Sequence, residues 1–349
     1  MDDLSIYDIL YVYESEISKG VKHKKKLVNF ERHKMEHIIS IYNRLKNRDY
    51  KIRKYHIFLI YEPKCRIIMS LDLEDKIINH YFTRYHLIPK LNKYLDIRNV
   101  ATRSGMGTDY GIRLTKKYIE QMKKYDNFYV LKLDISKYFY SISHEVLKSM
   151  LKKDLNEWEY DYISKVIDST DEDYIKSCID DLGMADLPTY KKGYGLGIGN
   201  MTSQFLSIYY LSSLDHYIIH DLHLPKMIRY MDDYVILHEN KEYLKECLVK
   251  IKDKLTNTYK LNCNIKKTNI TSIKEGFTFL GYFYKVENKK TIIHLRGESK
   301  RKVYKTLNHW QKIKNKTNFP KFYNVVNNYQ YTFKYTKESC IKDKIKSIV

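Results

Sequence analysis

Three pairs of adjacent aspartates occur in the chain: Asp2-Asp3, Asp180-Asp181 and Asp232-Asp233. The first two pairs lie in polar surroundings, where water solvates both carboxylates. The third pair lies in RYMDDYVILH (229–238), between residues that favour β-strands. Burying two carboxylates without neutralising them is costly. The pair therefore predicts a site for Mg²⁺ or Mn²⁺, because hard oxygen ligands suit these ions.

A third carboxylate is expected from Asp134, at the end of the strand-like segment VLKLD. Two adjacent strands would place Asp134 next to Asp232, on a tight hairpin that carries both Asp232 and Asp233. Mg²⁺ in phosphoryl-transfer sites is held by one or two carboxylates together with substrate phosphates. Two such ions, about 4 Å apart, activate a 3′-hydroxyl and stabilise the leaving pyrophosphate. We therefore expect two-metal nucleotidyl transfer with two Mg²⁺ ions, which Mn²⁺ can replace.

The elements that must position these aspartates follow from the hydrophobic periodicity. A buried strand is expected to end at Asp134, and a hairpin is expected across residues 227–238. Residues 201–222 predict one largely buried helix, and Ser143 is placed to cap another helix. Residues 153–192 are acidic, polar and poorly periodic.

The rest of the chain mixes helices and strands. Period-two alternation predicts an antiparallel hairpin over residues 50–70, broken at Glu62-Pro63. Two more short strands are expected, over residues 276–286 and 290–295. The segments that favour helices are residues 1–50, 73–86, the part that follows the Gly-bearing segment 103–114, residues 241–259 and the basic tail from Arg296. This order predicts one integrated chain of the α+β class.

The charge of the chain favours a polyanionic partner. There are 63 Lys and Arg residues against 42 Asp and Glu, a formal charge of +21. Such an excess costs self-repulsion unless nucleic acid is the usual partner. The alternative is a compositional bias towards Lys, Ile, Asn and Tyr, which explains the lysines but not the smaller number of acidic residues. The 35 tyrosines also offer stacking surfaces for bases, although core packing accounts for most of them.

Other patterns exclude several classes of protein. The five cysteines are scattered without a Cys-x-x-Cys motif, which fits a reducing cytosol and no zinc site or disulfide framework. His33 and His37 lie one helical turn apart, but Glu36 is misplaced for the His-Glu-x-x-His pattern, so a solvated helix face is expected. No apolar run is long enough to span a membrane, and the acidic N-terminus is unlike a signal peptide. A cytoplasmic protein without membrane contact is therefore expected.

The ordered set of motifs resembles the reverse transcriptases. KLDISKYF resembles their first palm motif, YMDD their metal-binding hairpin, NIKKTNI the motif that follows, and TFLGY the primer-grip segment. YEPKCRIIM and RSGMGT stand where the family has its fingers motifs, so the resemblance covers roughly residues 50–290. It implies an α+β right-hand polymerase with fingers, a palm built on an antiparallel sheet, and a small helical thumb. The domains expected are a basic helical N-terminal extension (1–50), fingers (51–130), a palm (131–290, with 153–200 partly returning to the fingers) and a small basic thumb (291–349).

The resemblance also assigns roles to matching positions. The metal site would comprise Asp134, Ile135, Asp232 and Asp233. Lys267 lies where a lysine could protonate the leaving pyrophosphate, with the adjacent Lys266 as the alternative.

Further residues would bind the nucleotide and the nucleic acid. The deoxynucleotide would contact Arg66, Ile135, Phe139, Ile198 and Gln204. Arg66 would reach its triphosphate, and Phe139 would be a steric gate against a 2′-hydroxyl, although core packing is the alternative. The nucleic acid would contact Arg103, Tyr230, Met231, Leu280 and Gly281. A surface salt bridge is the alternative role for Arg103.

The segment GLGIGNMTSQ narrows the resemblance. Ile198 and the Ser203-Gln204 pair resemble the reverse transcriptases of diversity-generating retroelements, and antiviral defence enzymes are close relatives. Ile cannot donate the hydrogen bonds of an amide, which suggests low fidelity opposite template adenine. The alternatives are a defence enzyme with an associated non-coding RNA, or a catalytically silent RNA-binding scaffold.

The expected partners follow from the same resemblance. They are a template RNA and its cDNA product, deoxynucleotides, and a cognate non-coding RNA or an accessory protein, with an oligomer also conceivable. No RNase H, intron-maturation or retron-type element is found in the sequence. We expect the basic run 19–26 and the basic tail to contact these partners.

Overall fold

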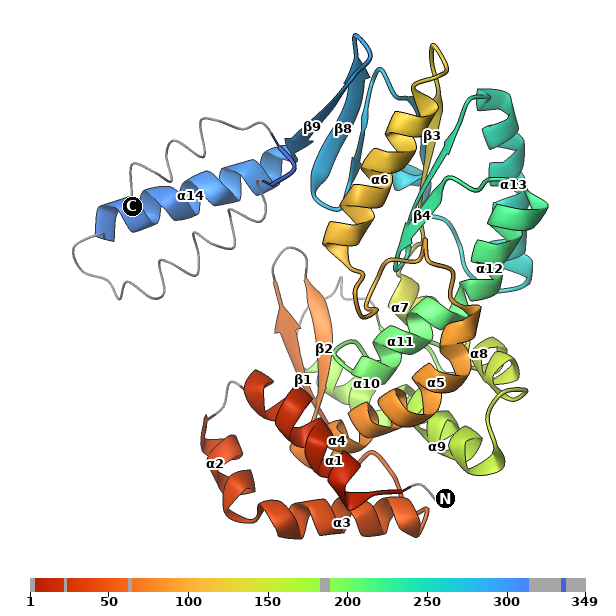
Figure 1. Cartoon of the computed structure of the whole chain (residues 1–349). Helices are drawn as coiled ribbons and strands as arrows, with labels where there is room; N and C mark the ends of the chain where they lie inside the picture. Colours follow the sequence, from red (N-terminus) through yellow and green to blue (C-terminus); the bar gives the residue numbers. More distant parts are fainter. Residues whose placement is uncertain (1–3, 22–23, 62–64, 183–188, 314–333, 337–349) are drawn as a thin grey trace.

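The structure is a computed structural model that describes residues 4–21, 24–61, 65–182, 189–313 and 334–336. Helices and antiparallel sheets alternate along the chain (Figure 1), so the expected α+β class is confirmed. None of the described helices is long and apolar enough to cross a membrane.

A four-stranded antiparallel sheet has the strand order β4-β5-β3-β6. It lies largely within the residues predicted to form the palm, and it is called the palm sheet. Its strands are β3 (Tyr129–Asp134), β4 (Met227–Tyr230), β5 (Asp233–His238) and β6 (Asn269–Ser272). Alternate residues of β5 point to opposite faces. Val235 and Leu237 pack in the same hydrophobic cluster as helix α6 (Thr108–Met122). Tyr234 and Ile236 pack in the cluster that contains helix α13 (Lys241–Asn257). The strand ending at Asp134 and the hairpin over 227–238 are thus both confirmed.

A three-stranded antiparallel sheet follows the palm, made of β7 (Phe277–Phe279), β8 (Tyr282–Glu287) and β9 (Lys290–Leu295). The expectation of a single strand over residues 276–286 is wrong. Leu280 and Gly281 have positive φ values of 48° and 83°, so the chain reverses there into a hairpin. The predicted start of the thumb, residue 291, falls inside β9, which pairs with β8.

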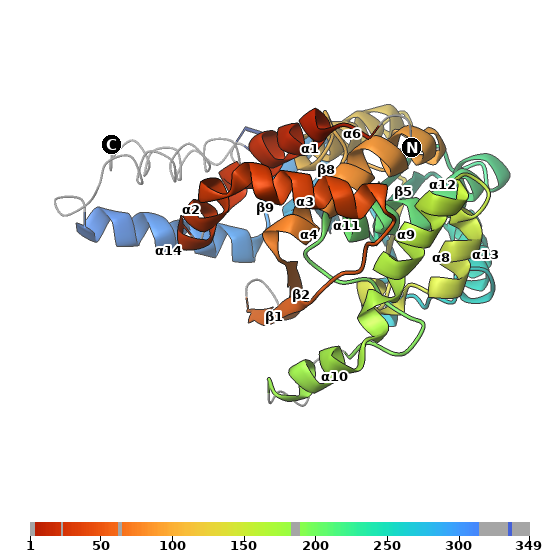
Figure 2. The same cartoon turned by 90° about the horizontal axis from the view of Figure 1, so that it is seen from below.

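A separate two-stranded sheet, β1 (Tyr55–Ile60) with β2 (Arg66–Leu71), confirms the antiparallel pairing expected over residues 50–70. The expected break at Glu62-Pro63 lies outside the described residues. This hairpin stands clear of the palm sheet in both views (Figure 1 and Figure 2). Its base contacts helices α4 and α10.

The helices cover the sheets and build the lower part of the molecule in Figure 1. The helices before β3 are α1 (Ile6–Val12), α2 (Lys24–Arg32), α3 (Lys34–Lys46), α4 (Leu73–Phe82), α5 (Ile88–Leu91) and α6 (Thr108–Met122). The helices between β3 and β4 are α7 (Tyr138–Ser141), α8 (His144–Leu151), α9 (Glu157–Asp168), α10 (Asp173–Asp180), α11 (Met201–Tyr210) and α12 (Ser212–His216). The last two are α13 (Lys241–Asn257) and α14 (Gly297–Ile313).

Short π- and 3₁₀-helical segments extend or join these helices. The π segments are Tyr13–Ile17, Thr83–Leu87 and Tyr217–Asp221. The 3₁₀ segments are Ser18–Gly20, Asn92–Tyr94, Ser169–Asp171 and Ile265–Lys267.

Several helix expectations are confirmed, and two need correction. Ser143 caps α8, where its side chain accepts a hydrogen bond from the Val146 backbone N–H. The expected single helix over residues 201–222 is interrupted at Leu211, whose φ and ψ of −99° and 8° separate α11 from α12. Residues 153–192, which lacked clear periodicity, contain α9 and α10. The missed signal was the capping box of α9, in which Asn156 and Glu159 bond each other's backbone N–H groups.

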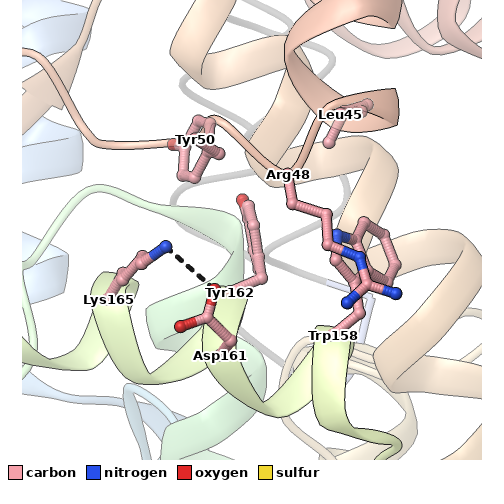
Figure 3. Close-up of a pocket in the computed structure, with 7 residues that line it drawn as sticks. All are labelled: Leu45, Arg48, Tyr50, Trp158, Asp161, Tyr162 and Lys165. Carbon is pink, nitrogen blue, oxygen red and sulfur yellow. Dashed lines mark hydrogen bonds and ion pairs between the residues drawn. The ribbon is translucent and has the colours of Figure 1, made fainter.

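Helix α9 also joins the N-terminal helices to the rest of the fold. A small pocket lies between the end of α3 and α9 (Figure 3), and the rings of Tyr50 and Tyr162 lie 4.7 Å apart within it. Asp161 and Lys165 form an ion pair of 2.8 Å at its edge. Most of this lining is aromatic or aliphatic, so the pocket is a packing junction rather than a catalytic cleft.

The two histidines at the N-terminus do not share a ligand. His33 pairs with Glu36 on the surface at 3.2 Å, as a solvated helix face predicts. His37 instead stacks on Phe30 and lies 2.7 Å from Glu74 in a half-buried position. The expectation of a solvated helix face therefore fits His33 but not His37.

Candidate active site

The backbone pairing of the palm sheet brings the predicted aspartates together. In the register of β3 against β5, Asp134 lies directly opposite Asp233. Tyr230 pairs with Asp233 across the β4–β5 hairpin, which leaves Met231 and Asp232 in the two-residue turn. The sequence predicts Asp134 next to Asp232, whereas the residue directly opposite Asp134 is Asp233, one position further along the chain. All three carboxylates therefore originate from one edge of the sheet.

The turn of the hairpin is tight. Met231 adopts a positive φ of 57°, in the left-handed region that a side chain rarely occupies. Its thioether sulfur accepts a hydrogen bond of 3.5 Å from the Ser207 hydroxyl on α11. This contact anchors the turn to the helix beneath it.

The carboxylates in this cluster are only partly neutralised by protein groups. Lys267 Nζ lies 2.5 and 2.8 Å from the two oxygens of Asp134. Lys132 Nζ lies 3.8 Å from Oδ2 of Asp233, and the other oxygen, Oδ1, is buried and has no hydrogen-bond partner in the part of the chain that the structure describes. A buried carboxylate oxygen without a donor is energetically unfavourable.

The pKa values reflect this shortage of positive charge. Burial raises the pKa of Asp232, and the nearby charge of Asp134 raises it further. Burial also raises the pKa of Asp233 to about 6, where Lys132 opposes the effect and Asp232 adds to it. Both carboxylates are thus in surroundings that favour an additional cation over the bare anion.

These observations fit a divalent metal ion, which the family implies at this position. The orphan oxygen of Asp233 and the acidic turn offer hard oxygen ligands for Mg²⁺ or Mn²⁺. Lys267 occupies the Asp134 carboxylate, and the three aspartates are not gathered as closely as the ligands of one ion. Among the described residues, the donors gathered within 4.8 Å of one another are instead those of His144, Asp168 and Asp171.

A fully buried ion pair supports the hairpin from below. Arg229 on β4 and Asp215 on α12 are both inaccessible to solvent. Two guanidinium nitrogens of Arg229 donate to Asp215, at 2.8 and 2.6 Å. A third nitrogen donates 3.0 Å to the Met231 carbonyl oxygen, in the strained turn itself. Tyr234 donates a further hydrogen bond to Asp215, at 3.0 Å.

The segment predicted to bind the nucleotide connects three parts of the fold. Phe139 lies half-buried on α7, and its carbonyl oxygen accepts a 2.7 Å hydrogen bond from the Leu196 N–H. The Ile198 carbonyl oxygen accepts a 2.8 Å hydrogen bond from Met69 on β2. The loop thus links the end of the palm strand to the β1–β2 hairpin, and keeps Phe139 and Ile198 in one region.

The other predicted nucleotide contacts lie near this loop or the sheet edge. Arg66 is exposed at the start of β2, and its charge acts on Asp232, whose pKa it lowers against the dominant effect of burial. Ile135 is buried directly after Asp134 and pairs with Cys263. Gln204 is exposed in the first turn of α11.

The predicted nucleic-acid contacts divide into two groups. Tyr230 and Met231 are half-buried at the hairpin, next to the carboxylates. Leu280 and Gly281 form the β7–β8 turn, where Leu280 packs against Gly111 of α6 so closely that a Cβ at Gly111 would lie 2.5 Å from its Cδ1. Their role in nucleic-acid binding stays a prediction.

Arg103 has a local structural role. Its guanidinium donates hydrogen bonds to the backbone carbonyl oxygens of Asp96, at 2.7 Å, and Asn99, at 3.3 Å. These bonds stabilise the loop before α6, and neither is the surface salt bridge that was the alternative role.

Some functional groups were missed by reasoning from the sequence. Lys132 and Arg229 are charged residues within strands, and Asp215 lies in the largely buried segment 201–222, which is the pattern of charged groups with a partner. The sequence also left Lys266 and Lys267 as alternatives. The structure places Lys267 at Asp134, while Lys266 is exposed.

The sheet, the hairpin turn and the carboxylates at its edge are the palm of a right-hand polymerase. The profile of the family "Reverse transcriptase (RNA-dependent DNA polymerase)" matches residues 52–284, which is well over half of the chain. The chain therefore belongs to the reverse transcriptase family.

Comparisons with individual proteins add less. A search of curated proteins found no match to this sequence. Among solved structures, an apo telomerase from Candida Tropicalis, truncated from its C-terminal domain, aligns with a TM-score of 0.48 and 15% sequence identity. The alignment covers 70% of this chain and 55% of that chain, so this chain spans about half the length of the telomerase chain.

The buried ion pair yields a testable prediction about the hairpin. Arg229→Met should lower the free energy of unfolding by about 3–5 kcal/mol, because it leaves the Asp215 carboxylate buried and unpaired. The double variant Arg229→Met/Asp215→Asn should recover part of this loss, since no buried charge remains and Tyr234 keeps an acceptor. Urea unfolding measures both effects.

The same pair of variants separates stability from positioning. The double variant should still have a reduced kcat in primer extension, because the Met231 carbonyl oxygen has lost its donor. Arg113→Met, which removes an exposed arginine on α6, is the control and should change the free energy of unfolding by less than about 0.5 kcal/mol. A double variant with the wild-type kcat would show that Arg229 contributes only to stability.

Proposed function

We propose that the chain is an RNA-directed DNA polymerase, a nucleotidyltransferase that makes cDNA from a cognate RNA template. The observation that carries the proposal is the register of β3 against β5, which places Asp134 opposite Asp233 beside the Met231-Asp232 turn. Membership of the reverse transcriptase family supports the choice of RNA as template and deoxynucleotides as substrates.

In this proposal the three aspartates bind metal ions, and Lys267 donates a proton to the leaving pyrophosphate. Asp134, Asp232 and Asp233 would hold two Mg²⁺ ions, with the backbone at Ile135 adjacent to them. When bound, these ions favour ionisation of the primer 3′-hydroxyl and stabilise charge on the leaving pyrophosphate. Lys267 holds a proton on Nζ at the Asp134 carboxylate, from where it can be donated to the pyrophosphate.

The nucleotide is positioned by groups around the loop. The exposed guanidinium of Arg66 binds the triphosphate from the fingers. Phe139 excludes a 2′-hydroxyl through its ring, and the hydrogen bond from Leu196 to its carbonyl oxygen fixes the backbone of this gate. Ile198 and Gln204 contact the nucleotide and template base. The nucleic acid lies along the hairpin at Tyr230 and Met231.

The β7–β8 turn and the loop before α6 form the rest of the proposed nucleic-acid path. Leu280 and Gly281 contact the primer from the β7–β8 turn. Arg103 supports that path indirectly, because it braces the loop from Asp96 to Gly107.

We further propose that synthesis has low fidelity and serves a diversity-generating retroelement. Ile198 presents an apolar side chain where an amide would otherwise donate and accept hydrogen bonds. The template RNA and an accessory protein would then be partners, and the basic run 19–26 is a candidate contact. Sequencing the nucleic acid that copurifies with the protein distinguishes this role from defence, since a repeat altered at adenines favours the retroelement and a non-coding RNA favours defence.

The polymerase proposal predicts the effect of removing one carboxylate. Asp232→Asn should lower incorporation of deoxynucleotides on an RNA template with an annealed DNA primer by on the order of 100-fold or more, because it removes a metal ligand worth several kcal/mol. Primer extension with Mg²⁺ measures the rate. Asp180→Asn/Asp181→Asn, the exposed pair on α10, is the matched control and should leave the rate unchanged. Wild-type synthesis by Asp232→Asn would refute the role of this carboxylate, and a wild-type chain without any synthesis would favour the RNA-binding scaffold instead.

The fidelity proposal predicts a change at a single side chain. Ile198→Gln should lower misincorporation opposite template adenine, because an amide restores hydrogen bonds that hold template and nucleotide in register. Sequencing the cDNA products gives the error spectrum. Val249→Gln, an exposed position on α13, controls for a general effect of glutamine. An unchanged error spectrum in Ile198→Gln would refute the role of this residue.

A further inference from the structure

A second group of metal-ligating side chains lies outside the palm carboxylates. It comprises His144 at the start of α8, Asp168 at the end of α9, and Asp171 in the 3₁₀ segment that follows. Neither the polymerase mechanism nor the sequence motifs use these three residues.

The protonation of His144 is indicated by its surroundings. The side chain is 3% exposed, and its Nε2 lies 2.7 Å from the Gly195 carbonyl oxygen. A carbonyl oxygen can only accept, so Nε2 carries the proton. Nδ1 is buried and has no hydrogen-bond partner among the described residues. In the neutral imidazole, its lone pair points towards two carboxylates.

The distances within the group suit a metal ion better than a charged imidazole. Nδ1 lies 3.3 Å from Oδ1 of Asp168 and 3.6 Å from Oδ2 of Asp171. A charged N–H donor normally lies about 2.7–2.9 Å from a carboxylate oxygen. Ligands about 2.0–2.2 Å from a tetrahedral ion are separated from each other by roughly 3.3–3.6 Å. The two separations from Nδ1 match the second arrangement, and the ligand atoms of all three residues lie within 4.8 Å of one another.

We propose that His144, Asp168 and Asp171 bind a divalent transition-metal ion, Zn²⁺ or Mn²⁺. An imidazole nitrogen with two carboxylate oxygens suits these ions better than Mg²⁺, which prefers oxygen ligands alone. Metal-bound histidines commonly donate their other ring N–H to a backbone carbonyl oxygen, as His144 does to Gly195. Water would complete the coordination.

Other contacts of the two carboxylates bear on the strength of binding. Lys148 Nζ lies 2.6 and 2.5 Å from the oxygens of Asp168 and competes with the ion for that carboxylate. The backbone N–H of Gly193 donates to both oxygens of Asp171, at 2.9 and 3.1 Å, which fixes its orientation. Removing the Lys148 charge should therefore strengthen metal binding.

The position of the ion gives it a structural role. The backbone N–H of His144 donates to the Gly193 carbonyl oxygen, and the backbone N–H of Gly195 donates to the Ile142 carbonyl oxygen. The next residue, Leu196, bonds the carbonyl oxygen of Phe139. An ion at this site therefore ties α8 and α9 to the loop that continues to Ile198. The metal site itself does not depend on the proposed polymerase function. Only the idea that this loop positions the nucleotide at Ile198 rests on that function.

Metal binding can be measured without enzyme activity. The full chain carrying Asp232→Asn/Asp233→Asn, which weakens the palm site, is stripped with a chelator and titrated with Zn²⁺, Mn²⁺ or Mg²⁺ by calorimetry. We expect one tight site for Zn²⁺ or Mn²⁺ that excess Mg²⁺ does not fill.

Three further substitutions in that background assign the site. Asp171→Asn should weaken binding at least 10-fold, and Lys148→Met should strengthen it by a similar factor. Asp161→Asn, an exposed residue of the same helix α9, should have no effect. Circular dichroism checks that each variant folds. If Asp171→Asn does not fold, Lys148→Met still tests the site. No tight site in the parent, or equal affinity in the parent and Lys148→Met, would overturn the proposal, whatever the outcome for polymerase activity.

Discussion

The antiparallel register between β3 and β5 is the constraint on which the rest of the site depends. It places Asp134 opposite Asp233, and the hairpin turn adds Asp232 beside them. Three carboxylates at one sheet edge repel each other, and a shift by one residue would turn the side chains to the opposite face. The core packing on both faces of the sheet keeps this register, so the fold sustains an arrangement that electrostatics alone would not favour.

Two clusters of charge in the palm show how differently the protein treats buried carboxylates. Asp215 is fully buried and receives hydrogen bonds from Arg229 and Tyr234, so its charge is matched by protein groups. Asp233 has one distant lysine and one orphan oxygen. The first cluster stabilises the hairpin, and the second leaves affinity for a cation. The backbone of Met231, which has a positive φ, connects the two clusters, because its carbonyl oxygen accepts a hydrogen bond from Arg229.

Much of the site could be predicted from local sequence, since strands and hairpins have short-range signals. The YMDD hairpin, the strand ending at Asp134 and the Ser143 cap were all readable from spacing and residue type. The partners of Arg229 and Arg103 were not, because a side chain's contacts across the fold leave no local pattern. Helices α9 and α10 were missed because their many polar residues hid the periodicity, although the Asn156 capping box marked the start of α9.

The proposed mechanism requires that the palm carboxylates hold metal ions during nucleotide addition. Electron paramagnetic resonance can count Mn²⁺ in a complex with RNA template, a DNA primer that lacks a 3′-hydroxyl, and the matching deoxynucleotide. The wild-type complex should hold more Mn²⁺ than the Asp232→Asn/Asp233→Asn complex, by an excess that approaches two ions per chain. Equal numbers of bound ions in the two complexes would contradict it.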